Sequence, residues 1–222
     1  MMSNKEYKAS RLTEMNGTNI SASVYNLILG LTVLWGAVVN IFMAATLSDA
    51  ICSMNYILMI VIYFIGSLGS MAIVYKSKNP IVSFLGFTGL SASMGLLLTY
   101  FVSYFEIGSI LLAFMATGVV TIVMIIAAVI FPDFFKGLGR VLCVTLLVTI
   151  IAELILSVIM GIGATVFDFI VVIIFCGYVG YDWVKAQEYP KTIDNAIDSA
   201  ADIYVDIVNL FVRILSIIGD RD

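Results

Sequence analysis

Four long stretches of this sequence contain no charged residue, and this feature constrains the fold more than any other. They cover residues 15–48, 50–75, 79–105 and 107–132. A helix that crosses a bilayer needs about 20 consecutive, mostly apolar residues, so each stretch is long enough for one span. The whole chain is 62% hydrophobic and 12% charged, whereas soluble domains are about 45–50% apolar and about 25% charged. This composition predicts an integral membrane protein and disfavours a soluble enzyme, a nucleic-acid-binding protein and a disordered chain.

The predicted architecture is an all-α bundle of seven transmembrane helices in one membrane domain. The apolar runs are continuous and lack the alternation expected of strands in an outer-membrane barrel. We assign residues 23–219 to this single domain, with residues 1–22 as a cytoplasmic N-terminal tail and residues 220–222 as a C-terminal tail. The predicted spans cover residues 24–47, 52–75, 80–103, 107–131, 138–160, 164–184 and Ile203–Ile218.

The basic residues predict the orientation, because Lys and Arg accumulate in cytoplasmic loops. With alternating spans, nine of the eleven basic residues fall on the same side as the N-terminus. The N-terminus of this multi-pass protein of the cell membrane is therefore expected in the cytoplasm. The side of the C-terminus stays open, since a re-entrant last segment would return Arg221 to the cytoplasm. The nine residues are Lys5, Lys8, Arg11, Lys76, Lys78, Lys136, Arg140, Lys185 and Lys191.

The chain has no histidine, which removes His-based catalytic triads, His-ligated zinc and the usual switch near neutral pH. Cys52, Cys143 and Cys176 lie far apart in apolar runs, so we expect buried, apolar side chains rather than a disulfide framework. Titrating chemistry inside the membrane therefore falls to carboxylates or thiols. We expect no enzymatic activity and no resident cofactor.

Two carboxylates are predicted at similar depth in the membrane. Asp182 ends the sixth span and Asp206 begins the seventh, both on the cytoplasmic side. Two close carboxylates do not both ionise readily, so such a pair titrates as a unit and suits a proton sensor. Its oxygens also suit a transient contact with Ca²⁺. The alternative is that each carboxylate reaches interfacial water separately.

Further polar residues support a path along the last span. Asp206, Asn209 and Arg213 recur at i, i+3 and i+7, on one helical face. Arg213 needs a counter-charge, for which Glu153 and Asp168 are candidates. A carboxylate at bilayer depth usually faces the bundle interior, so Glu153 is either a protonated, hydrogen-bonded acid or part of a polar path.

Acidic residues also recur every four positions upstream of Asp206, at Asp194, Asp198 and Asp202. If helical, they form an acidic face that would concentrate cations at the cytoplasmic mouth, with Asp202 as a supporting residue. The favoured interpretation is a simpler one, a solvated amphipathic face with its acids near a helix N-terminus.

Two motifs carry a resemblance to a known family. Residues 177–182 read GYVGYD and residues 203–211 read IYVDIVNLF, with weaker matches at Asn79-Pro80 and Gly108-Ser109-Ile110. Over about residues 20–219 the chain resembles a bacterial-type member of the Bax inhibitor-1 (transmembrane BAX inhibitor motif) family.

This resemblance implies a seven-helix fold with the last helix central, and a pH-sensitive leak of calcium ions across the membrane. Asp182 and Asp206 match the two paired aspartates that share protons and gate the pore of such proteins. Some relatives carry an arginine in the second span that latches onto this pair. Here that span has no charge, and Lys76 and Lys78 lie only at its end.

Two alternatives remain for the function. Intramembrane aspartyl proteases also place one Asp on each of two helices, and Tyr181-Asp182 fits their first motif; Tyr204-Val205-Asp206 lacks the Gly-x-Gly-Asp of the second. The other alternative is a non-catalytic modulator of a membrane protease. The expected partners are calcium ions and the lipid bilayer, with a membrane protease as a further candidate. No nucleic acid is expected, and the protein is expected to be a monomer.

Overall fold

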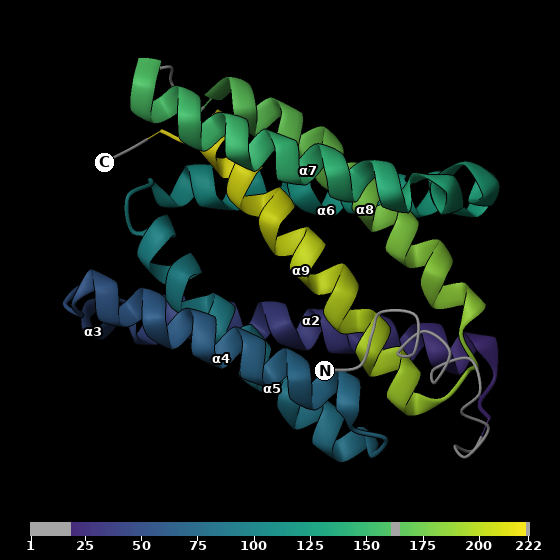
Figure 1. Ribbon diagram of the computed structural model, residues 1–222. Coiled ribbons are helices and arrows are strands. Elements are labelled where there is room, and N and C mark those ends of the chain that lie inside the picture. The colour runs from purple at the N-terminus through teal and green to yellow at the C-terminus, as the bar shows by residue number, and fades with distance from the viewer. Residues whose placement is uncertain (1–18, 161–164, 221–222) are drawn as a thin grey trace. The chain divides into compact units, whose positions relative to one another are not determined.

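The computed structural model describes residues 19–160 and 165–220, and within these ranges it contains helices and no strand (Figure 1). Six of these helices are long and apolar enough to cross a membrane, namely α2 and α4–α8. The helices are α2 (Ala22–Thr46), α3 (Ser48–Cys52), α4 (Tyr56–Lys76), α5 (Pro80–Val102), α6 (Ile107–Ile130), α7 (Pro132–Met160), α8 (Thr165–Glu188) and α9 (Ile193–Ile218).

The all-helical membrane class is as predicted, but the count of apolar spans in the described residues is six rather than seven. The predicted seventh span corresponds to the second half of α9. This part of the helix carries Asp206, Asn209 and Arg213, so its composition differs from that of the other spans.

Several helices begin where the sequence offers a capping side chain. The Asn55 side chain accepts a hydrogen bond from the backbone N–H of Ile57 (3.0 Å) at the start of α4. Asn79 caps α5 in the same way, accepting from the N–H of Ile81 (3.0 Å). Pro80 then occupies the first helical position, where its missing N–H leaves no bond unmade.

Two of the connections between the predicted spans, at residues 132–137 and 48–51, are helical in the structure. Helix α7 starts at Pro132 rather than at residue 138, so Lys136 lies on a helix and not in a connection. Proline is well suited to a first helical turn, which explains the earlier start. The predicted loop at 48–51 contains α3. The residues of the N-terminal tail, the loop at 161–163 and Arg221 lie outside the described residues.

The long loop expected between the sixth and seventh predicted spans, at residues 185–201, is also mostly helical in the structure. Helix α8 continues to Glu188, and α9 begins at Ile193 after a short connection. Pro190 interrupts the helical run, and the Thr192 hydroxyl accepts a hydrogen bond from the N–H of Asn195 (3.2 Å) at the new start. The sequence therefore contains the local signals for this helix start, Pro190 and Thr192, just before the acidic residues.

The chain divides into two compact units. Unit 1 comprises residues 1–103 and 186–204, and unit 2 comprises residues 104–185 and 205–222. The first part of α9 thus belongs to unit 1 and its second part to unit 2.

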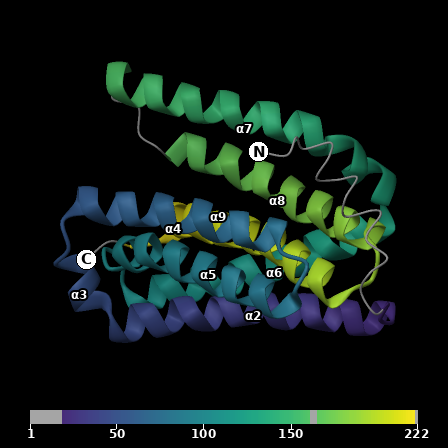
Figure 2. The same cartoon turned by 60° about the horizontal axis from the view of Figure 1, so that its bottom comes forward.

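In unit 1, α2 and α4 pack on α5, and α4 and α5 run side by side in both views (Figures 1 and 2). Met43, Ile51 and Met59 form a buried cluster there. At the other end, the Tyr25 hydroxyl of α2 lies 3.0 Å from the carbonyl oxygen of Ala186.

The connection between α8 and α9 is held by the same tyrosine. The Tyr25 hydroxyl also lies 3.0 Å from the Ser199 hydroxyl and 3.2 Å from the carbonyl oxygen of Asn195. The Lys191 ammonium lies 4.2 Å from the centre of the Tyr25 ring, and burial lowers the pKa of this lysine. The first span is thus tied to residues made near the end of the chain.

In unit 2, α7 and α8 run side by side (Figure 2), and glycines of α8 lie close to side chains of α7. A Cβ atom added at Gly180 would lie 2.2 Å from the Phe135 ring, and one at Gly177 would lie 2.6 Å from Leu142. Phe135 is itself buried with Ala128 and Val184. The small residues of the GYVGYD motif therefore allow close helix packing, as expected for helices in lipid.

The prediction that the three cysteines are buried is wrong. All three cysteines lie in the described ranges and none is disulfide-bonded, but Cys52 and Cys143 are exposed and Cys176 is only partly buried. In a membrane protein an apolar run does not distinguish the interior from the lipid-facing surface, because lipid tails are as apolar as a protein core.

Gly180→Ala should lower the stability of the protein. The new methyl group would collide with the buried Phe135 ring, and overpacking of this kind costs about 1–3 kcal/mol. Gly118→Ala is the matched control, because it is also a mid-helix glycine of unit 2 and has no atom within 4 Å of the added Cβ. Thermal unfolding in detergent should show a lower midpoint for Gly180→Ala alone. Equal midpoints for the two variants would show that α8 does not depend on this close approach.

The orientation can be tested with two exposed positions at opposite ends of α4. In a variant without native cysteines, Lys78→Cys should lie in the cytoplasm and Asp49→Cys on the opposite side, because α4 separates them. A membrane-impermeant maleimide added to intact cells should label only Asp49→Cys. Labelling of both positions from outside would contradict the predicted topology.

Candidate ion path

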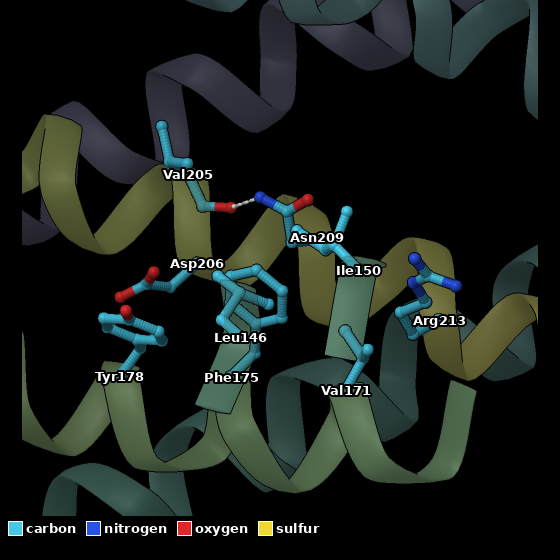
Figure 3. Close-up of a pocket in the computed structure, with 9 residues that line it drawn as sticks. All are labelled: Leu146, Ile150, Val171, Phe175, Tyr178, Val205, Asp206, Asn209 and Arg213. Atoms are coloured by element: carbon cyan, nitrogen blue, oxygen red, sulfur yellow. Dashed lines mark hydrogen bonds between the residues drawn. The ribbon is translucent and has the colours of Figure 1, made fainter. Parts of the chain in front are cut away.

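The polar stripe predicted on the last helix faces one cavity in unit 2. Asp206, Asn209 and Arg213 of α9 all line this cavity, whose volume is about 370 Å³ (Figure 3). The Asn209 amide donates a hydrogen bond to the carbonyl oxygen of Val205 (2.8 Å), one turn earlier on the same helix. The facing helices supply Leu146, Ile150, Val171, Phe175 and Tyr178. The cavity thus has one polar wall and mostly apolar surroundings.

Asp206 marks one end of this cavity. It is 5% exposed, and the Tyr178 side chain of α8 lies beside its carboxylate (Figure 3). Tyr178 is within electrostatic range of both Asp206 and Asp182, which follows it by one turn on α8. The two aspartates are therefore in the same unit and near the same tyrosine, and their direct pairing stays a prediction.

Two neighbours of the aspartates were not predicted from the sequence. Lys185 lies 3.5 Å from the Asp182 carboxylate, at a spacing of i to i+3 on α8. Tyr178 precedes Asp182 by four residues, which puts both on one face of the helix. Spacing along the helix was the available signal for both contacts.

Arg213 marks the other end of the cavity and has both of the predicted counter-charges. Its Nη1 atom lies 2.6 Å from Asp168 Oδ1 on α8 and 3.1 Å from Glu153 Oε1 on α7. Its Nη2 atom donates a second hydrogen bond to Glu153 (3.3 Å). The prediction that Arg213 pairs with Glu153 or Asp168 is confirmed for both.

Asp194 and Asp198 are buried and Asp202 is half-buried, which contradicts the favoured interpretation of a solvated face. Asp194 is 7% exposed and Asp198 is 2% exposed. The Ser83 hydroxyl of α5 donates to the Asp194 carboxylate (2.6 Å), and the Tyr75 hydroxyl of α4 donates to Asp202. Asp202, predicted as a supporting residue of the path, belongs to unit 1, whereas Asp206 belongs to unit 2.

The described residues contain no group of three or more His, Cys, Asp or Glu side chains that could hold a metal ion. A resident Ca²⁺ takes six to eight oxygen ligands. Asp182 and Asp206 together have four carboxylate oxygens, which is fewer than such a site needs.

The comparison with known families gives one match. The family described as "Inhibitor of apoptosis-promoting Bax1" matches residues 18–222. No curated protein matches the chain. The match extends over nearly the whole sequence, including the six apolar helices and all of α9. The chain therefore belongs to the Bax inhibitor-1 family of membrane proteins.

Proposed function

We propose that this protein is a pH-sensitive leak pathway for Ca²⁺ in the cell membrane, gated by Asp182 and Asp206. The observation that carries the proposal is the cavity of unit 2, which is lined by the polar stripe of α9 and has Asp206 at one end. Acidic and polar groups at bilayer depth are expensive to insert, and they commonly mark a path for ions.

The charges near the aspartates suggest how the gate responds to protons. The Lys185 ammonium lies 3.5 Å from the Asp182 carboxylate and offsets part of its negative charge. Asp206 adds a negative charge that is 5% exposed. Ionisation of a carboxylate that is so little exposed to water is costly, so binding of a proton or of a passing cation is favoured there. Competition between protons and Ca²⁺ for this carboxylate would make the leak depend on pH.

The remaining parts of the proposal rest on the sequence and not on the cavity. Calcium is the transported ion and not a resident cofactor, and the pathway is formed within a monomer whose N-terminus is cytoplasmic. The pathway conducts and does not catalyse, so neither proteolysis nor nucleic-acid binding is required. Modulation of a membrane protease is a separate activity that no contact of the described residues favours.

Calcium flux into liposomes tests the proposal directly. The purified protein is reconstituted into vesicles that contain a fluorescent calcium indicator, and the initial rate of Ca²⁺ entry is measured over a series of pH values. We expect a rate above that of protein-free vesicles and a clear change with pH. Rates equal to those of protein-free vesicles at every pH would refute the leak, and a constant elevated rate would refute the carboxylate gate.

A further inference from the structure

We infer that Glu153, Asp168 and Arg213 form a second charged end of the proposed path, and that their net charge selects cations over anions. This inference rests on the proposed function, because it concerns which ions pass the same cavity. Its basis is the ion cluster itself, which joins α7, α8 and α9 within unit 2.

The three side chains do not balance. One guanidinium contributes a positive charge and two carboxylates contribute two negative charges, so the cluster has a net charge of −1 when all are ionised. The cluster itself consists of Glu153 from α7, Asp168 from α8 and Arg213 from α9. Further along the same cavity the titratable neighbours are Asp206 and Tyr178.

The two carboxylates differ in a way that assigns them different tasks. Asp168 makes the shortest contact to Arg213, at 2.6 Å, and its side chain is 4% exposed. Glu153 makes longer contacts of 3.1 and 3.3 Å, and its side chain is 21% exposed. Asp168 thus neutralises the arginine, and Glu153 provides the surplus negative charge.

This surplus charge decides the sign of the field at Arg213. An arginine with a single partner would leave this end of the cavity neutral, and an arginine alone would repel Ca²⁺. With both partners the end is negative, and low-dielectric walls concentrate such a field along a narrow path. Cations are therefore attracted at this end of the path and anions are rejected.

Two conservative variants test the inference. Glu153→Gln and Asp168→Asn both change the net charge from −1 to zero, but only the second removes the shortest ion pair. Each should lower the ratio of Ca²⁺ to Cl⁻ flux about tenfold, equivalent to about 1.4 kcal/mol. The fluxes are measured in vesicles containing a calcium indicator or a chloride-quenched dye. Glu106→Gln, an exposed acid of the same unit, is the control and should keep the wild-type ratio.

The possible outcomes separate this inference from the proposed function. A similar loss of selectivity in both variants, with unfolding midpoints that identify folded protein, supports it. If Glu153→Gln keeps the wild-type ratio, the cluster is structural and the inference is overturned, even where Asp168→Asn fails to fold. A wild-type protein that leaks Ca²⁺ while both variants behave normally overturns only this inference. A wild-type protein that passes no Ca²⁺ overturns the proposed function as well.

Discussion

The variants Asp182→Asn and Asp206→Asn should each lose most of the pH dependence of Ca²⁺ flux while still folding. Replacement of a carboxylate by an amide removes the titrating group with little change in volume. Two like charges about 4 Å apart repel by about 4 kcal/mol at an effective dielectric constant of about 20. About 5.5 kcal/mol moves a two-state equilibrium from 1:99 to 99:1, so about 4 kcal/mol is enough to move it from mostly one state to mostly the other.

The control for the gate is Asp133→Asn, which changes an exposed aspartate at the start of α7 in the same unit. Its pH profile should match that of the wild type. Normal pH profiles in the Asp182 and Asp206 variants would show that the pair is not the sensor and would direct attention to Glu153. Cleavage of a membrane peptide that depends on both aspartates would favour the protease alternative instead.

Arg213→Ala should be strongly destabilising. The substitution leaves Glu153 and Asp168 together without the cation that lies 3.1 and 2.6 Å from them. Removal of one partner from a buried ion pair typically costs about 3–5 kcal/mol. We expect a clearly lower midpoint of thermal unfolding in detergent. Arg213→Lys should recover part of the loss, because it keeps the charge but not the two-nitrogen contact.

Arg140→Ala is the matched control for this prediction. Arg140 is an exposed arginine of α7 in the same unit. Exposed substitutions usually change stability by no more than about 0.5 kcal/mol. If the midpoints of Arg213→Ala and Arg140→Ala are the same, the cluster does not hold the three helices together.

The sequence predicted the parts of this protein that depend on long-range absence of charge or on simple helical spacing. The first four spans follow from charge-free stretches, and the stripe of Asp206, Asn209 and Arg213 follows from the helical period. Electroneutrality identified the partners of Arg213, because few carboxylates are available at bilayer depth. Each of these inferences needed only the charged and polar residues, which stand out in an otherwise apolar sequence.

The environment of the upstream aspartates was beyond this reasoning. Asp194 and Asp202 are satisfied by Ser83 and Tyr75, which are ordinary residues of distant helices. Acidic residues in a row are most simply interpreted as solvated, and only the packing of α9 with α4 and α5 brings the hydroxyl groups to them. The division of α9 between two units had no sequence signal, since no change of composition marks Tyr204.

The ties between the first span and the α8–α9 connection have a consequence for how the protein is made. A ribosome releases residues 1–103 long before residues 186–204, yet both belong to unit 1. Until then the hydroxyl groups of Ser83 and Tyr25 lack their hydrogen-bond partners on α9, which have not yet been synthesised. Domains completed early can fold during translation, whereas contacts of such large sequence separation form late. Biogenesis of this protein therefore depends on its last helix, and the half-made chain is the form that a membrane chaperone or protease would meet.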